Sequence, residues 1–323
     1  MPYAVAKLNY IESKMSGVEI IKVKAEDDDI RLNRWFLKYY PGLSLGRLQK
    51  LLRTKQIKVD GNKAESNMRL SAGQEIRVPP LDNEKKKITH TELSAKDEQY
   101  ALNLVIYKDE NIIVLNKPSG LAVQGGTNTF HHVDGLLDAL RFGNSEKPKL
   151  VHRIDKETSG LLVLARNRKM ADTLTKAFRE HTLQKTYLAL VRGVPKHNAG
   201  EIKAPLEKLD GRVQILETGK IAITQYNVID TVGDKYALVA ANPLTGRTHQ
   251  IRAHLEYLGV PIYGDDKYFG KERCKNSLIA HKLHLHAYKI DLSSVYGRKM
   301  LLCAELPDYF KESLKTLGLN FKE

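Results

Sequence analysis

Two short segments of this 323-residue chain gather side chains that could carry out chemistry. In the first, VHRIDKETSGLLVL at residues 151–164, Asp155 follows Arg153 and precedes an apolar run. A carboxylate at the start of a buried strand loses hydration, which costs free energy unless a cation lies beside it. The second segment, GRTHQIRAH at residues 246–254, supplies Arg247 and Arg252. Beside either arginine Asp155 would stay ionised, as a nucleophile or base requires. A structural ion pair explains the pattern equally well.

Motifs for other kinds of site are weak. Residues 264–271, GDDKYFGK, have the wrong glycine spacing for a phosphate-binding loop, and Glu272 stands where a magnesium-binding Ser or Thr belongs. A zinc site is disfavoured because the candidate ligands lack a cysteine or acid at ligand spacing. These candidates are His249, His254, His281, His284 and His286. The run from His281 to His286 alternates as a strand does. We expect neither a metal ion nor an organic cofactor.

Several blocks of the sequence resemble, in order, the motifs of RNA pseudouridine synthases of the RluA family. HRIDKETSG at residues 152–160 resembles the HRLDxxTSG signature, with Ile154 in place of the usual Leu. The other blocks are LNKPSGLAVQGG at 115–126, KTY at 185–187, PLTGRTHQIRAH at 243–254 followed by Gly264-Asp265, and LHA at 285–287. Ordered agreement of this kind is highly specific and covers most of residues 18–310.

The resemblance implies roles for individual residues. Asp155 would be the catalytic carboxylate, by attack on the sugar or by removal of a sugar proton, and Arg252 its ion-pair partner. Tyr187 would stack on the uracil and help to remove the C5 proton. Arg153 would fill the space that the flipped-out base leaves. Further residues would face the RNA substrate: His152, Arg247, Thr248, His249 and Lys117.

The substrate class also follows from the resemblance. Residues 122–126, AVQGG, stand where many relatives have His-Pro-Gly, and they resemble members that act on large-subunit ribosomal RNA. The chain would therefore isomerise specific uridines to pseudouridine in that RNA. Two alternatives stay open: a synthase acting on other large-subunit helices or on transfer RNA, and a non-catalytic RNA-binding factor in ribosome assembly.

Charge supports an RNA partner. The formal net charge of the chain is +14, and residues 31–63 contain nine Lys or Arg residues against one acid, Asp60. A long field of one sign suits binding to phosphates. We expect helices at 32–39 and 45–52, the second capped by Ser44, followed by strands at 57–59 and 75–78. This unit resembles the S4 RNA-binding domain. Its expected phosphate contacts are Arg31, Arg34, Arg47, Lys50, Arg53 and Lys55.

The composition predicts a modular α+β protein. We expect an N-terminal extension at 1–17, an S4-like domain at 18–80, a polar linker at 81–100 and a catalytic domain at 101–323. In the catalytic domain, helices flank a mixed and mainly antiparallel sheet. The expected strands are 104–107, 112–115, 161–165, 187–191, 222–229 and 237–241, and the expected helices are 134–142, 169–180 and 250–258.

The remaining features concern location and assembly. No apolar run approaches the roughly 18 residues of a membrane span, and the first residues lack the apolar core of a signal peptide. Two cysteines, Cys274 and Cys303, cannot form a disulfide framework. We therefore expect a cytoplasmic protein with ribosomal RNA as its partner and no membrane association. Nothing in the sequence requires more than a monomer.

Overall fold

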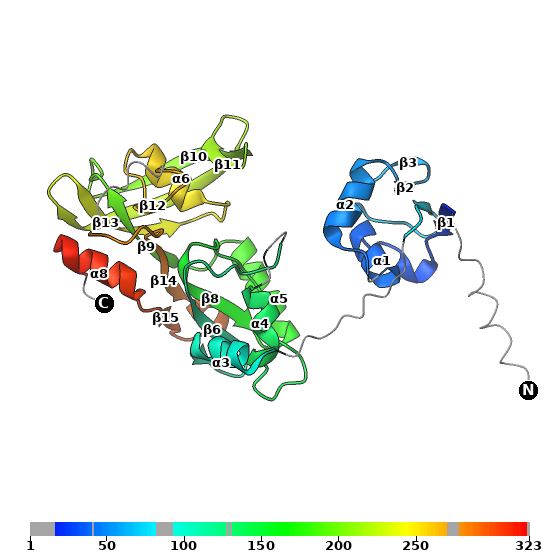
Figure 1. The fold of residues 1–323 in the computed structure, drawn as a ribbon, viewed down its shortest axis with the longest axis horizontal. Coiled ribbons are helices and arrows are strands. Elements are labelled where there is room, and N and C mark those ends of the chain that lie inside the picture. The colour runs from blue at the N-terminus through cyan, green and yellow to red at the C-terminus, as the bar shows by residue number, and fades with distance from the viewer. Residues whose placement is uncertain are drawn as a thin grey trace, which may run out of the picture. The chain divides into compact units, whose positions relative to one another are not determined.

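The chain divides into two compact units, residues 1–92 and residues 93–323 (Figure 1). The structure is a computed structural model that describes residues 17–40, 42–81, 93–126, 129, 131–269 and 278–321. Nearly all of the expected N-terminal extension and the middle of the expected linker lie outside the described residues. The end of that linker is not an irregular tether, because Ala95–Asn103 form helix α3. Ala101 of this helix is buried in the core of the second unit.

The first unit combines two short helices with a small antiparallel sheet of strand order β1-β4-β2-β3. Ser44 caps helix α2, since its hydroxyl accepts a hydrogen bond of 3.2 Å from the backbone N–H of Arg47. Trp35, Phe36 and Leu48 are buried in the core. The elements are β1 (Glu19–Lys22), the 3₁₀ turn η1 (Ala25–Asp27), α1 (Leu32–Tyr39), α2 (Leu45–Arg53), β2 (Lys58–Val59), β3 (Asn62–Lys63) and β4 (Glu75–Val78).

The second unit contains one large sheet of strand order β11-β10-β12-β13-β9-β14-β8-β6-β5, with β15 paired to β14 and β7 paired to β8. The pair β8–β14 is parallel and joins Ser159 to His286, whereas the other described pairs are antiparallel. The predicted α+β class with a mixed, mainly antiparallel sheet is therefore confirmed.

Helices cover the sheet of the second unit because its central strands are apolar on both faces. On strand β9, Leu188 and Leu190 belong to the cluster beneath α8, whereas Ala189 and Val191 belong to the cluster beneath α6. The first elements are β5 (Val105–Lys108), β6 (Ile112–Lys117), α4 (Val133–Leu136), the 3₁₀ turn η2 (Leu137–Leu140), β7 (Lys149–Leu150), β8 (Ser159–Ala165), α5 (Arg168–Arg179) and β9 (Lys185–Arg192). They continue with β10 (Ala199–Leu209), β11 (Arg212–Ile215), β12 (Lys220–Val232), β13 (Tyr236–Pro243), α6 (Gln250–Tyr257), β14 (Leu285–Asp291), α7 (Ser293–Tyr296), β15 (Leu301–Cys303) and α8 (Asp308–Leu317).

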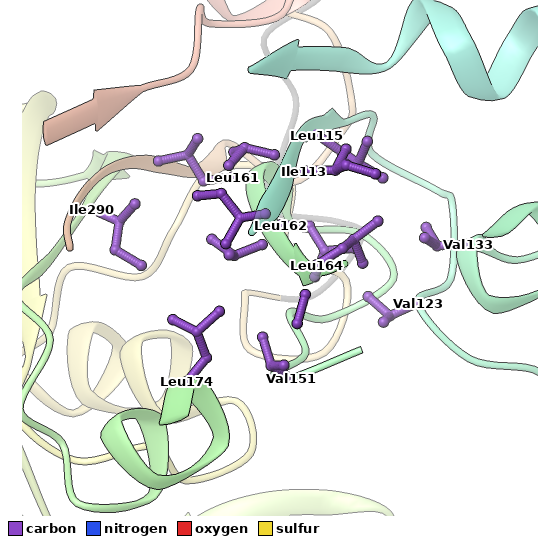
Figure 2. Close-up of a cluster of buried hydrophobic side chains, with 14 of the residues drawn as sticks. Ile113, Leu115, Val123, Val133, Val151, Leu161, Leu162, Leu164, Leu174 and Ile290 are labelled. Carbon is purple, nitrogen blue, oxygen red and sulfur yellow. The ribbon is translucent and has the colours of Figure 1, made fainter. Parts of the chain in front are cut away.

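Strand β8 lies at the centre of a third apolar cluster of the second unit (Figure 2). All seven of its residues are buried, and Leu161, Leu162 and Leu164 belong to the same cluster as Leu174 of helix α5. A strand buried on both faces reads as a continuous apolar run rather than an alternating one. The loop that carries Asp155 therefore leads directly into a rigid part of the core.

Gly160 allows the parallel contact between β8 and β14. Its φ is +105°, and a Cβ built on it would lie 2.3 Å from the carbonyl oxygen of Ala287. No side chain fits there without moving a strand. The strand pairing next to the Asp155 loop therefore requires glycine at position 160.

Candidate active site

Asp155 lies at a cavity of about 470 Å³ in the second unit. It belongs to the loop between β7 and β8, where Thr158 N–H donates to the Asp155 carbonyl at 3.2 Å. The carboxylate is partly accessible, with its side chain 22% exposed. The cavity is lined by the Asp155 loop, the end of α5, the start of β9 and the segment that leads into α6. A carboxylate in this position can reach a ligand that enters the cavity.

Arg252 contacts two carboxylates. Its Nε and Nη2 donate to Oδ2 and Oδ1 of Asp265, both at 2.6 Å, whereas Nη1 lies 3.5 Å from Oδ2 of Asp155. Burial alone would lower the pKa of Arg252, but the hydrogen bond and charge of Asp265 and the charge of Asp155 raise it. The expected proximity of Asp155 and Arg252 is present, and the tighter partner of the arginine is Asp265.

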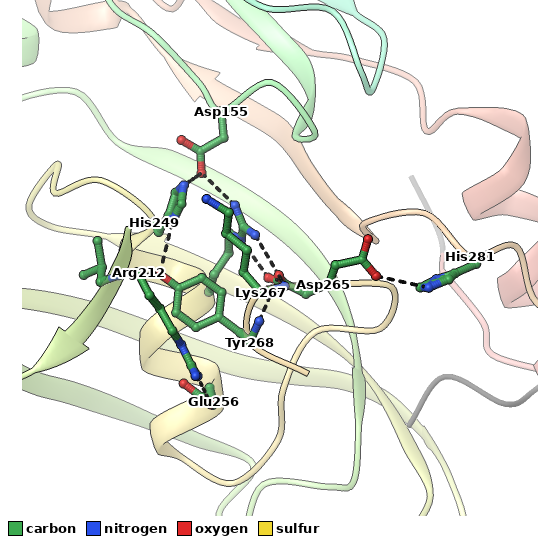
Figure 3. Close-up of polar contacts among 11 residues, drawn as sticks. Asp155, Arg212, His249, Glu256, Asp265, Lys267, Tyr268 and His281 are labelled. Atoms are coloured by element: carbon green, nitrogen blue, oxygen red, sulfur yellow. Dashed lines mark hydrogen bonds and ion pairs between the residues drawn. The ribbon is translucent and has the colours of Figure 1, made fainter. Parts of the chain in front are cut away.

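Asp265 is fixed by the turn in which it stands. Its Oδ1 also accepts the backbone N–H groups of Lys267 at 3.1 Å and Tyr268 at 3.2 Å (Figure 3). The preceding Gly264 has a φ of +75°, and a Cβ there would lie 1.8 Å from the carbonyl oxygen of Lys282. The Gly264-Asp265 pair therefore builds a turn that holds the Arg252 guanidinium in place.

His249 approaches the same carboxylate from the start of helix α6. Its Nε2 lies 3.7 Å from Oδ2 of Asp155, and its Nδ1 lies 3.0 Å from the hydroxyl of Tyr268 (Figure 3). The residue has left-handed backbone angles, φ 51° and ψ 20°. Strained backbone of this kind persists only where surrounding contacts hold it, and it gathers at functional sites.

Gln250 holds the loop that carries Arg247 and His249. Its Oε1 accepts from Thr245 Oγ1 at 2.7 Å and from Arg247 N–H at 3.0 Å, while its Nε2 donates to the carbonyl of Ile223 at 2.9 Å. A buried amide with these contacts fixes the loop against strand β12. The loop is therefore preorganised beside Asp155.

The cavity brings together most of the predicted site residues. His152, Arg153, Asp155, Tyr187, Arg247, His249 and Arg252 line it. Arg153 and Arg247 are exposed, so their side chains are accessible to a ligand. Thr248 is exposed but does not line the cavity.

Lys117 is buried and does not line the cavity, contrary to the expectation that its side chain is accessible to the substrate. Its side chain is buried, and Nζ donates to the carbonyls of Pro118 at 2.9 Å, Leu121 at 2.7 Å and Lys156 at 3.0 Å. Burial lowers its pKa to about 7. Because Lys156 follows Asp155 directly, Lys117 ties the loop after β6 to the Asp155 loop.

His152 lines the cavity through a ring that already has neighbours. The ring stacks on Phe178 with centroids 4.1 Å apart, and Nε2 accepts the backbone N–H of Val163 at 2.8 Å. Burial lowers its pKa to about 3, with the charge of Lys185 acting in the same direction. His152 is therefore a neutral wall of the cavity.

Tyr187 lies on strand β9, and its ring packs at the border of two apolar clusters. Burial raises the pKa of its phenol, and the negative charge of Asp155 raises it further. A phenol in this state stays protonated near pH 7. The environment thus supports stacking by Tyr187 and opposes its use as the base that removes the C5 proton.

The sequence analysis assigned no role to three titratable residues that line the cavity. Lys185 and His181 stand at the start of β9 and just before it, and Arg179 ends helix α5. Burial lowers the pKa of Lys185 and of His181, and for His181 the charges of Lys185 and Arg247 add to this effect. Lys185 was visible in the lysine–x–tyrosine block, whereas no local pattern marked His181.

His284 and His286, two of the histidines considered as zinc ligands, have partners inside the core, whereas His281 lies at the surface and pairs with Asp266 at 3.2 Å. The ring of His284 is hydrogen bonded to Ser313 Oγ at 2.8 Å, and that of His286 to Ser159 Oγ at 2.9 Å. Both are buried, so neither imidazole is accessible to a ligand. Within the described ranges, no three His, Cys, Asp or Glu residues are grouped so that they could hold a metal ion. In the same part of the chain, no helix has the length and apolar character of a membrane span.

Comparisons with known proteins agree with this geometry. Residues 111–257 match the family model of RNA pseudouridylate synthase. A ribosomal large subunit pseudouridine synthase C of Rickettsia conorii is 39% identical over 296 residues, which cover 88% of this chain and 96% of that protein. The synthase of the same name from Vibrio vulnificus is 36% identical over 295 residues, which cover 88% of this chain and 90% of that protein.

A solved structure shares the fold. Human RNA pseudouridylate synthase domain containing 4 superposes with a TM-score of 0.60 and 30% sequence identity, over 72% of this chain and all of that one. Its likeness, the family model and the similarity to the bacterial synthases over most of their length agree. The chain belongs to the RNA pseudouridine synthase family and is an isomerase that converts uridine to pseudouridine in RNA.

Proposed function

We propose that this enzyme modifies uridines in large-subunit ribosomal RNA and that Asp155 is its catalytic carboxylate. The observation that carries the role of Asp155 is the lining of the cavity. Asp155 is the one acid among the described lining residues, and five cations accompany it: Arg153, Arg179, Lys185, Arg247 and Arg252. Such a site attracts a polyanion and leaves a single carboxylate to react with it.

The reaction requires a uridine that lies outside the base stack of its helix. A base stacked in a helix cannot reach Asp155, so it must be flipped out, at a cost of a few kcal/mol. Arg153 is exposed next to the cavity and can occupy the vacated space. Tyr187 offers its ring to the uracil, and Lys185 and Arg247 offer positive charge to the phosphates on either side.

Two routes lead from this complex to the product. In one, a carboxylate oxygen of Asp155 bonds to C1′ while the C1′–N1 bond breaks and its electron pair leaves with the uracil. In the other, the carboxylate takes the C2′ proton, the C2′–H electron pair forms a C1′–C2′ double bond, and the same C1′–N1 bond breaks. The detached uracil then rotates, and its C5 bonds to C1′ while the Asp155–C1′ bond breaks in the first route, or while C2′ regains its proton from Asp155 in the second. The C5 proton then leaves and N1 takes up a proton. Neither route adds an atom or changes the oxidation state overall.

The first unit has a separate proposed role in binding RNA, as an S4-like domain. Arg31, Arg34, Arg47, Lys50, Arg53 and Lys55 are all exposed. The nearby acids already have partners, since Asp27 accepts from Lys38 at 2.6 Å and Asp29 pairs with Arg69. An exposed basic face with few acids supports contacts to phosphates without sequence preference.

The choice of ribosomal RNA rests on the relatives, which are named ribosomal large subunit pseudouridine synthase C. The test is site-resolved mapping of pseudouridine in all cellular RNA, with and without the gene. We expect sites to disappear from large-subunit ribosomal RNA. Loss confined to transfer RNA would overturn this substrate, and loss of no site would favour an assembly factor.

A further inference from the structure

Two donors, His249 just before helix α6 and Arg252 in its first turn, approach one oxygen of Asp155. Arg252 Nη1 lies 3.5 Å and His249 Nε2 lies 3.7 Å from Oδ2. Among the described residues, no donor contacts Oδ1. The carboxylate is therefore asymmetric, with one oxygen facing both donors and the other without a protein partner.

The turn that follows α6 holds both donors. Asp265 in this turn binds Arg252, and Tyr268, three residues later, contacts His249 (Figure 3). The ring of Tyr268 also lies beside Arg252, with the guanidinium carbon 5.1 Å from the ring centroid. One short segment thus sets the positions of the two groups that face Asp155.

The two contacts of the Tyr268 hydroxyl determine which nitrogen of His249 carries the proton. The hydroxyl oxygen of Tyr268 accepts the backbone N–H of Val213 at 3.1 Å, and His249 Nδ1 is its other partner among the described residues, at 3.0 Å. If Nδ1 carried a proton, the hydroxyl proton of Tyr268 would have no acceptor among the residues that the structure describes. Tyr268 therefore donates to Nδ1, and the proton of a neutral imidazole is on Nε2.

Electrostatics favours the same arrangement. Burial lowers the pKa of His249, although the charge of Asp155 opposes this shift, so the ring is neutral near pH 7. With its proton on Nε2, the ring directs an N–H at the Asp155 carboxylate. The opposite tautomer would direct a lone pair at that negative charge.

We propose that Tyr268 is a positioning residue that keeps the proton of His249 on Nε2, so that His249 and Arg252 hold Oδ2 of Asp155 and Oδ1 is the oxygen that reacts. The distances of 3.5 and 3.7 Å are longer than good hydrogen bonds, and such contacts tighten when a substrate closes the site. On either route given above, Oδ1 supplies the electron pair, to C1′ or to the C2′ proton. This inference rests on the proposed role of Asp155.

The direct test is nuclear magnetic resonance of the full-length protein with ¹⁵N-labelled histidine, with His249 assigned through His249→Gln. We expect the Nδ1 signal of an unprotonated nitrogen in the wild type and a shift toward mixed tautomers in Tyr268→Phe. The phenylalanine keeps the ring and removes only the hydroxyl. A protonated Nδ1 in the wild type would overturn the proposal. This readout is independent of activity, so it can fail or succeed separately from the proposed function.

Kinetics supply the second test. Tyr268→Phe should lower kcat about 3- to 10-fold, the effect of one neutral hydrogen bond, with KM unchanged. Tyr296→Phe is the matched control, because it removes a partly buried hydroxyl that donates to Asp109 at 2.7 Å, outside the cavity lining. It should keep the wild-type kcat. Equal kcat for Tyr268→Phe and the wild type would contradict a positioning role.

A pair of substitutions at His249 separates the two ring nitrogens. Glutamine places an amide N–H near the position of Nε2, whereas asparagine places one near Nδ1. We expect His249→Gln to keep several-fold more activity than His249→Asn. The reverse order would contradict a donor at Nε2.

Discussion

On helix α2 of the first unit, Lys50 and Arg53 are exposed and form no ion pair with a described carboxylate. In the second unit, the guanidinium of Arg252 is buried, and carboxylates contact it on two sides. An exposed cation keeps its hydration and can bind any phosphate nearby. A buried cation needs fixed partners, and those partners determine the geometry of a reactive group. The first arrangement suits affinity for RNA and the second suits catalysis.

Breaking the buried network should have the largest effect. Asp265→Asn leaves the Arg252 guanidinium buried with only Asp155 as its carboxylate partner, and loss of one member of such a pair costs about 3–5 kcal/mol of stability. Arg252 should then close on Asp155 and lower kcat about 100-fold or more. Denaturant unfolding and single-turnover conversion measure the two effects. The neighbouring Asp266→Asn, an exposed residue paired with His281, is the control and should change neither by much.

Closing the space at Gly160 should come next. Gly160→Ala places a Cβ 2.3 Å from a backbone oxygen at a φ of +105°, so the strand pairing must shift, at an expected cost of about 2–4 kcal/mol. Gly46 is the control in the first unit, because it lies in α2 with nothing within 4 Å of the added Cβ. Gly46→Ala should be neutral or slightly stabilising. A Gly160→Ala protein as stable as the wild type would refute the close approach.

Acid should lower the stability of the second unit more than that of the first. Burial lowers the pKa of His254, His284 and His286 to about 4, whereas the first unit has no histidine among its described residues. Between pH 6.5 and 4 the unfolded chain therefore binds protons that the folded second unit does not. The contribution of these histidines to the free energy of unfolding of the second unit is fully present above pH 6.5. It is lost as the pH falls, by at most about 1.4 kcal/mol per pH unit for each histidine.

The single tryptophan, Trp35, lies in the core of the first unit and reports on that unit alone. Its fluorescence midpoint in denaturant should move little between pH 6.5 and 4.5, while the midpoint for the large sheet, followed by circular dichroism, should fall. Parallel shifts of both midpoints would contradict the assignment of acid sensitivity to buried histidines.

The basic face should give the smallest effect, on affinity alone. Lys50→Ala with Arg53→Ala should weaken RNA binding and reduce the slope of log K against log salt by about 1 for each lost phosphate contact, with kcat unchanged. Lys22→Ala is the control, because Lys22 is exposed but lies 3.7 Å from Glu75. An unchanged slope in the double variant would remove the basic face from RNA binding.

Local pattern predicted the elements with strong periodicity. Helices α1 and α2, the cap at Ser44 and the apolar strand β8 appear within a residue or two of expectation. Strand β10 did not stand out, because Pro205 and several charged residues interrupt its alternation. The helix α3 was taken for linker, since a polar, charged sequence does not show whether it caps a core.

The sequence indicated most of the residues that line the cavity but not the contacts among them. Resemblance placed Asp155 and Arg252 together although 97 residues separate them. Sequence could not show that Asp265 is the tighter partner of Arg252, because either acid satisfies the same charge rule. Nor could it show that Lys117 is turned into the backbone, which depends on how two loops meet.

The most direct test of the account is single-turnover conversion of a ribosomal RNA substrate by purified Asp155→Asn, with Glu157→Gln as the control from the same loop. Glu157 is exposed and does not line the cavity. We predict at least about a 10³-fold slower rate for Asp155→Asn and the wild-type rate for Glu157→Gln. A folded Asp155→Asn enzyme that forms pseudouridine at the wild-type rate would show that Asp155 is not the catalytic carboxylate.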